Sequence, residues 1–288
     1  MIRLALHHIS VIQSLGITGS ISATAQFLGL TQSAISHRIR EAERRVGTKL
    51  FNRDGHKFTM TQTGKRLFAS ATAILDELTR VEKDLEHMSS GVDTVIRLGA
   101  ACYAGFDWFP RLYSELGNTF PNCALEIVPD TTEDPATLIY KNIAEIVLTT
   151  SPVERPDFTC TPLVDDTLVV VMPTDHYLSN NETIDPTKIA NETIVTHHIY
   201  PEKGREYETI FKPLNILPKK IISAGRTQAL IEMIVARKAI AILPRLSIRK
   251  QANRAGLITR PLKPHIPLVT WYALTKESSE HEELVNLI

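Results

Sequence analysis

Apolar residues in the first 30 positions repeat at helical spacing and predict two short helices. Gly16 and Gly19 interrupt the pattern between the two. The repeating positions of the first helix are Leu4, His8, Val11, Ile12 and Leu15. The side chain of Ser20 is suited to cap the second helix, and Gly29 supplies the tight turn that ends it.

A third predicted helix follows Thr31 and has two distinct faces. One face is apolar and is expected to be buried, at Ile35, Ile39, Ala42 and Val46. The opposite face presents hydrogen-bonding and cationic side chains, at Gln32, Ser33, Ser36, His37 and Arg40. Two short helices joined by a glycine turn, with such a stripe on the second, are typical of a helix-turn-helix.

Residues 50–53 and 57–60 are predicted to form a hairpin, because Asp54-Gly55 suits a turn that needs positive φ. Basic side chains gather at its tip, at Arg53, His56 and Lys57. A basic hairpin directly after a helix-turn-helix indicates the winged form of this motif.

From residue 67 onward the apolar positions follow a heptad pattern, with intervals of four and three residues. The positions are Leu67, Ala71, Ile74, Leu78, Val81, Leu85 and Met88. A repeat of about 3.5 residues sustained over three heptads predicts a coiled coil, so this helix is expected to dimerise the chain. A long helix packed on its own domain is the alternative.

Beyond residue 92 the pattern changes to alternating strands and helices. Strands are expected at residues 95–100, 124–128, 146–149, 168–172, 194–197, 220–223, 240–243 and 269–274. Helices are expected at residues 106–116, 136–141, 205–214 and 227–237. Such alternation predicts parallel sheets covered by helices, arranged as one domain or as two α/β lobes.

Charge is distributed unevenly along the 288 residues, although 32 basic and 32 acidic side chains give a formal net charge of zero. A neutral chain would argue against nucleic acid as a partner. The first 66 residues, however, contain ten Lys or Arg and three acids, a charge of +7. The remainder contains 22 basic and 29 acidic residues, or −7. This asymmetry indicates a DNA-binding part joined to a part with another task.

The polar stripe of the third helix has the chemistry that base reading requires. In the major groove Arg40 can pair bidentately with guanine, and Gln32 with adenine. The hairpin cations would lie on phosphates or in the adjacent minor groove. A solvated helix face is the alternative, and the basic hairpin and the local charge favour DNA.

These residues resemble the signature of the LysR-type transcriptional regulators. The matching segments are residues 19–25, 30–36, 38–43, 47–51 with Arg53, and 61–64, and Thr24 and Ala42 stand where the family usually has Ala and Leu. The resemblance covers the whole chain and implies an α+β multidomain protein. Its expected parts are a winged helix-turn-helix at 1–62, a dimerising linker helix at 63–90 and a two-lobed effector-binding domain at 91–288. That domain resembles periplasmic binding proteins, with lobe I at about 91–164 and 268–288 and lobe II at about 165–267.

The resemblance also implies a small effector between the lobes. Ligands of open α/β sheets lie off the carboxyl ends of the strands, where helix N-termini present N–H groups. The expected lining residues are Ala101, Cys102, Tyr103, Asp130, Thr131, Thr149, Thr150, Ser151, His197, His198 and Thr227. Ordinary loop positions are the alternative for each of them.

Residues 102–110 with Trp108, together with Phe120-Pro121 and 149–152, look most like the subgroup that activates methionine-biosynthesis genes. This resemblance implies homocysteine, or another amino acid or small carboxylate, as the effector. The other partners it implies are double-stranded operator DNA, further copies of the chain in a dimer or a tetramer, and RNA polymerase. A redox-sensing regulator that acts through Cys102 is the alternative, since a thiol at a helix N-terminus has a lowered pKa.

Enzymatic and metal-dependent functions find little support in the motifs. The sequence has no nucleophile elbow, P-loop, dinucleotide fingerprint or H-E-x-x-H motif, although an enzyme that uses Cys102 stays a distant alternative. The neighbouring pairs His7-His8 and His197-His198 are expected to point in different directions and to make poor metal sites. We therefore predict no enzyme, no cofactor and no metal.

The three cysteines predict a reduced, cytoplasmic chain. Cys102, Cys123 and Cys160 form no C-x-x-C pair and lie at no zinc-ligand spacing from histidine. No apolar run approaches the roughly 20 residues that span a bilayer, and no cleavage site follows the N-terminal apolar stretch. We therefore expect no membrane partner.

Overall fold

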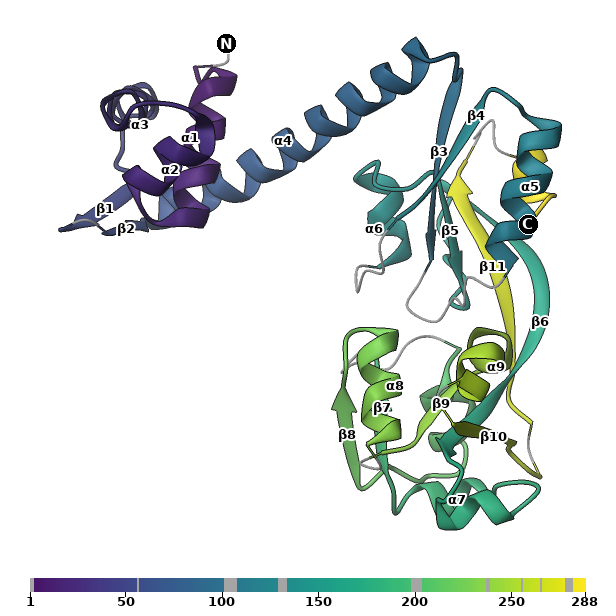
Figure 1. Ribbon diagram of the computed structural model, residues 1–288. Helices are drawn as coiled ribbons and strands as arrows, with labels where there is room; N and C mark the ends of the chain where they lie inside the picture. The colour runs from purple at the N-terminus through teal and green to yellow at the C-terminus, as the bar shows by residue number, and fades with distance from the viewer. Residues whose placement is uncertain are drawn as a thin grey trace. The chain divides into compact units, whose positions relative to one another are not determined.

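The computed structural model shows two compact units, Met1–Ser90 and Gly91–Ile288 (Figure 1). It describes residues 3–55, 57–100, 108–128, 134–197, 204–236, 239–254, 256–264, 266–277 and 282–288. None of the described helices is both long and apolar enough to cross a membrane. Each unit has its own hydrophobic core.

The first unit is a winged helix-turn-helix extended by a long helix. Its helices and strands are α1 (Leu6–Thr18), α2 (Ile21–Leu28), α3 (Gln32–Val46), β1 (Phe51–Asp54), β2 (Lys57–Met60) and α4 (Gln62–Ser89). The strands β1 and β2 pair antiparallel and form the predicted wing. The predicted order of helices and the hairpin are therefore confirmed.

Local sequence sets the ends of these helices. The hydroxyl groups of Ser20 and Thr31 accept hydrogen bonds from the N–H groups of Ala23 and Ala34, which caps α2 and α3. Gly29 ends α2 with a φ of 63°, in the left-handed region that favours glycine. The helix-turn-helix is thus specified by caps and a turn that are visible in the sequence.

Helix α4 begins in close contact with the domain and then leaves it. A Cβ atom on Gly64 would lie 2.1 Å from the carbonyl oxygen of Leu50, so only glycine permits this approach. Ala71 is fully buried against the same domain. Farther along, apolar side chains are about half exposed, at Ile74, Val81, Leu85 and Met88.

The upper half of the second unit in Figure 1 is lobe I, a mixed sheet covered by helices. Strand β3 (Thr94–Ala100) lies between β4 (Cys123–Ile127) and β5 (Ile146–Thr149) and pairs parallel with both. Strand β11 (Leu268–Lys276) pairs antiparallel with β5 and with β6 (Phe158–Pro173). The helices of this lobe are α5 (Phe109–Thr119), α6 (Pro135–Tyr140) and α10 (Glu282–Val285).

Lobe II is built on the second half of β6. There β6 pairs antiparallel with β9 (Ala241–Pro244) and β10 (Leu257–Pro261). Strand β7 (Thr193–Thr196) pairs parallel with β8 (Lys220–Ser223) and joins β9 through a bridge between Ile194 and Ile240. Its helical elements are η2 (Tyr177–Asn180), α7 (Pro186–Ile189), η3 (Tyr207–Phe211), α8 (Thr227–Val235) and α9 (Arg245–Arg254).

Four features of the second unit differ from the sequence-based expectation. The sheets are mixed rather than parallel, because β6, β9, β10 and β11 pair antiparallel. The strand expected at 168–172 is the second half of a 16-residue strand. The helix expected at 205–214 is a single π-helical turn, Tyr207–Phe211, and β10 and α9 were not predicted at all.

Candidate functional site

The polar stripe of α3 lies on the surface of the first unit. Gln32, Ser33, His37 and Arg40 are exposed, and Ser36 is partly exposed. The apolar face of the same helix contributes Ile35, Ile39 and Ala42 to the core. The structure thus separates the two faces of α3 as their spacing predicts. The exposed face offers an extended row of hydrogen-bond donors and acceptors along the helix.

The hairpin that follows α3 in the chain carries exposed cations. Arg53 lies on β1 opposite Phe58, Lys57 lies on β2 opposite Asp54, and both cations are exposed. The Nε–H of Arg53 donates to the carbonyl oxygen of Gly55 at 2.9 Å, and its guanidinium lies 5.9 Å from the centre of the Phe58 ring. His56 lies outside the described residues.

A buried carboxylate ties α3 to the wing. Glu43 is 8% exposed, and its Oε1 accepts from the backbone N–H groups of Leu50 at 3.0 Å and Phe51 at 3.4 Å. Its Oε2 forms an ion pair with Lys49 at 2.7 Å. The end of α3 and the start of β1 are therefore held together by one side chain, whose role the helical pattern did not reveal.

A second polar cluster joins α1 to α3. The Nε2 of His8 lies 3.2 Å from the Nε2 of His7 and 3.2 Å from Oε2 of Glu41. Arg45 donates to Oε1 of Glu41 at 2.9 Å through its Nε–H. The expectation that these neighbouring histidines point apart is therefore wrong.

Electrostatics in this cluster keep Glu41 ionised. Hydrogen bonds from His8 and Arg45 lower the pKa of Glu41 to about 2. Desolvation, followed by the effect of His8 and then of Arg38, lowers the pKa of His7 below its usual value. At neutral pH the cluster thus contains an anionic carboxylate and a neutral His7 imidazole.

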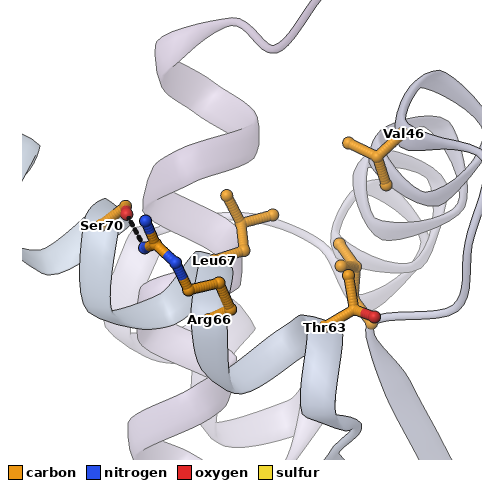
Figure 2. Close-up of a pocket in the computed structure, with 6 residues that line it drawn as sticks. Val46, Thr63, Arg66, Leu67 and Ser70 are labelled. Carbon is orange, nitrogen blue, oxygen red and sulfur yellow. Dashed lines mark hydrogen bonds between the residues drawn. The ribbon is translucent and has the colours of Figure 1, made fainter.

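A pocket of about 320 Å³ opens where α3, β1 and α4 meet. Its lining residues are Val46, Leu50, Thr63, Arg66, Leu67 and Ser70. Figure 2 shows the Arg66 guanidinium beside Ser70, whose Oγ accepts from Nη1 at 2.6 Å. Leu67, the first residue of the heptad pattern, thus lines this pocket and also packs against the core of the first unit.

In the second unit, the five candidate effector residues that the structure describes form two groups. At the end of β5, the buried Thr149 and Thr150 precede Ser151, whose N–H donates to Oγ1 of Thr149 at 3.0 Å. At the end of β7, Nε2 of the buried His197 lies 3.0 Å from Oγ1 of Thr227, the first residue of α8. Ala101, Cys102, Tyr103, Asp130, Thr131 and His198 lie outside the described residues.

Arg205 adds a cation that the sequence pattern did not indicate. Its side chain is fully buried, its Nη1 donates to Oγ1 of Thr150 at 3.2 Å, and its Nε lies 3.4 Å from Oε2 of Glu206. Since Thr150 belongs to lobe I and Arg205 to lobe II, this hydrogen bond connects the lobes. No sequence signal marked Arg205, because its burial arises only from the tertiary fold.

Cys123 and Cys160 are poor candidates for redox chemistry. Burial raises the pKa of Cys123 and of Cys160 above the usual value. Because the thiolate is the reactive form, a raised pKa makes both thiols less nucleophilic.

The amino-acid sequence matches two protein families, one within the first unit and one over the second. Residues 6–65 match "Bacterial regulatory helix-turn-helix protein, lysR family", and residues 89–288 match "LysR substrate binding domain". The chain belongs to the LysR family. It is a LysR-type DNA-binding transcriptional regulator, and the winged domain, linker helix and two-lobed α/β domain expected from the sequence are confirmed.

Curated relatives in the LysR family share about a quarter of their residues with this chain. The HTH-type transcriptional regulator MetR of Salmonella typhimurium is 25% identical over 257 residues, which cover 89% of this chain and 80% of the relative. The HTH-type transcriptional regulator GltR of Bacillus subtilis is 26% identical over 244 residues, covering 83% and 79%.

Solved structures confirm the LysR-type fold. Full-length CbnR in complex with its target DNA has a TM-score of 0.78 at 13% identity, covering 99% of this chain and 97% of that one. The regulatory domain of MetR from N. meningitidis has a TM-score of 0.52 at 21% identity, covering 67% and 89%. At these identities the likeness concerns the fold alone.

Glu43 provides a test of how α3 is held in this LysR-type domain. Glu43→Ala should lower the free energy of unfolding of the first unit by about 2 kcal/mol, because two buried N–H groups lose their acceptor. Glu43→Gln keeps an oxygen at this position and loses only the pair with the exposed Lys49, so it should cost less than about 1 kcal/mol. Urea unfolding followed by helical circular dichroism measures both, and equal losses would contradict this role.

Proposed function

We propose that this LysR-type regulator reads its operator through the stripe of α3 and positions itself through the wing. The observation that supports this most is the exposed row Gln32, Ser33, Ser36, His37 and Arg40 on the second helix of the motif. A helix fits the major groove, where these side chains can hydrogen-bond to base edges. The exposed Arg53 and Lys57 are suited to phosphate contacts, and we assign His56 of the wing to the same role.

Dimerisation through α4 is the second part of the proposal. Of the seven heptad positions, Leu67 and Ala71 pack on their own domain, whereas Ile74, Val81, Leu85 and Met88 are 42 to 59% exposed. A continuous apolar stripe of this kind on a helix is suited to a second copy of the same helix. Leu78, which is partly buried, completes the stripe. Such a dimer, or a tetramer made from two of them, would present two recognition helices to an imperfect palindrome.

A small effector that binds between the lobes is the third part. Hydroxyl groups of Thr149, Thr150 and Thr227, the His197 imidazole and the Arg205 guanidinium offer polar contacts at the ends of β5 and β7. The relatives named MetR support the resemblance to regulators of methionine biosynthesis and make homocysteine the first ligand to test. Binding would stabilise one arrangement of the lobes over another, and contact with RNA polymerase would carry the response.

Direct base reading is tested with Arg40. The full chain is first used to select an operator from random DNA. Arg40→Ala should then reduce discrimination between selected and random DNA by about 1 to 3 kcal/mol, through loss of a base contact. Lys57→Ala should weaken binding to both DNAs alike and lower the salt slope by about 1.

The matched control for Arg40 is Arg111→Ala, which removes the same charge from an exposed position in the second unit. It should leave both affinities unchanged in a fluorescence anisotropy titration. If Arg40→Ala lost affinity equally for selected and random DNA, direct reading by this residue would be wrong.

Dimerisation is tested with Leu85, which is 59% exposed on α4. Leu85→Asp should weaken self-association by roughly 100-fold, since an unpaired charge would have to be buried in the interface. Thr79→Asp introduces the same charge at an exposed position of α4 outside the heptad stripe and should have little effect. Sedimentation equilibrium gives both constants, and an unchanged mass for Leu85→Asp would exclude this interface.

The effector proposal is tested by thermal shift of the full chain with homocysteine, other amino acids and small carboxylates. A ligand at about 100 times its Kd should stabilise the protein by about 2.7 kcal/mol. Thr150→Val removes a hydroxyl near the lobe junction and should reduce this shift, whereas Thr119→Val, on the exposed end of α5, should not. An undiminished shift in Thr150→Val would place the ligand elsewhere.

A further inference from the structure

The cluster of His7, His8 and Glu41 consists of three side chains that the DNA-reading stripe does not include. It contains two imidazoles from the first turn of α1 and one carboxylate from the middle of α3. One ligand atom from each of the three side chains lies within 4.8 Å of the others. His8 is fully buried, Glu41 is 22% exposed, and His7 is exposed. The cluster is therefore anchored on one side and open to solvent on the other.

The distances in this cluster agree with tetrahedral metal coordination. Zinc binds histidine nitrogen and carboxylate oxygen at about 2.0 to 2.2 Å, which places neighbouring ligand atoms roughly 3.4 Å apart. Both separations that involve Nε2 of His8 are 3.2 Å. A metal ion could thus be accommodated with small side-chain rotations, and solvent would supply its remaining ligands through the open side at His7.

We propose that His7, His8 and Glu41 form a binding site for a divalent transition metal of the zinc type. Two imidazoles and one carboxylate favour zinc, cobalt, nickel or copper over magnesium and calcium, which prefer oxygen ligands. Arg45 occupies Oε1 of Glu41, and Oε2 faces His8. The metal would take Oε2, so the ion pair with Arg45 is kept.

Metal binding requires a change in the proton position on His8. In the structure, Nδ1 of His8 accepts the Ala5 N–H at 3.0 Å, which places the single imidazole proton on Nε2. Coordination through Nε2 moves that proton to Nδ1, so the imidazole stays neutral and no net proton is released. The Ala5 N–H then loses its acceptor and turns to water at the first turn of α1, where Ala5 is partly exposed.

The consequence lies in the position of the two helices. α3 carries the DNA-reading stripe, and α1 packs against it in the core of the first unit. A metal that bridges the two helices stabilises the arrangement that presents the stripe. Metal binding should therefore raise the thermal stability of the first unit.

The experiment titrates the metal-free chain of residues 1–288 with Co²⁺ and then displaces the cobalt with Zn²⁺. We expect one Co²⁺ per chain, with the visible d–d absorption of a four- or five-coordinate nitrogen and oxygen site. His7→Gln and Glu41→Gln should each weaken binding at least tenfold. His87→Gln, which removes a histidine from α4 in the same unit, should bind as the wild type does. Because His7 is exposed, the metal-free His7→Gln variant should unfold at the wild-type temperature.

Imidazole ¹⁵N spectra of the full chain distinguish metal binding from the hydrogen bonds already present. Saturation with Zn²⁺ should move the proton of His8 from Nε2 to Nδ1, and His7→Gln should prevent the change at the same metal concentration. Equal cobalt affinity in wild type and His7→Gln, absence of the d–d spectrum, or an unchanged His8 tautomer at saturation would each overturn the proposal.

Discussion

The backbone of Leu50 is the point on which the DNA-binding unit depends. Its N–H donates to the buried Glu43 carboxylate of α3, and its carbonyl oxygen accepts from the N–H of Thr61 at 2.9 Å. The same carbonyl lies against Gly64 of α4 so closely that no Cβ fits between them. Helix α3, the wing and the linker helix are thus positioned by one peptide segment. A shift of α4 at this point would be transmitted to the wing and to α3 through these short polar contacts.

The second unit has an equivalent point at Asp166, where β6 passes from lobe I to lobe II. One oxygen of this buried carboxylate accepts from the Trp271 indole at 3.2 Å and from the Leu246 N–H at 2.9 Å. Trp271 lies on β11 and Leu246 in the first turn of α9. Two strands and a helix N-terminus are therefore joined where the lobes meet. Relative movement of the lobes would bend β6 and β11 near Asp166. This residue is not close along the chain to either Thr150 or Arg205, whose hydrogen bond also connects the lobes.

Periodic patterns and capping residues allowed the first unit to be predicted almost completely. Ser20, Gly29 and Thr31 act locally, so their effect is visible in the sequence. The first half of β6 was missed because its exposed and buried residues alternate irregularly and include Asp165 and Asp166. Arg205 was missed because a buried arginine is defined by distant partners. The proximity of His7 and His8 was missed because side-chain rotation on the first turn of α1 brings their ring centres within 4.0 Å.

The two parts of the first unit, the winged domain and the portion of α4 that leaves it, differ in charge as well as in packing. The first 66 residues carry +7, whereas residues 67–90 contain five acidic and two basic residues. The part of α4 that leaves the domain is thus acidic and is repelled by DNA phosphates. We expect its apolar stripe to stay available for self-association while α3 and the wing, which carry six of the ten cations, approach DNA. The net charge of zero is therefore the sum of a basic region, which is expected to meet DNA, and an acidic remainder, which is expected to meet other partners.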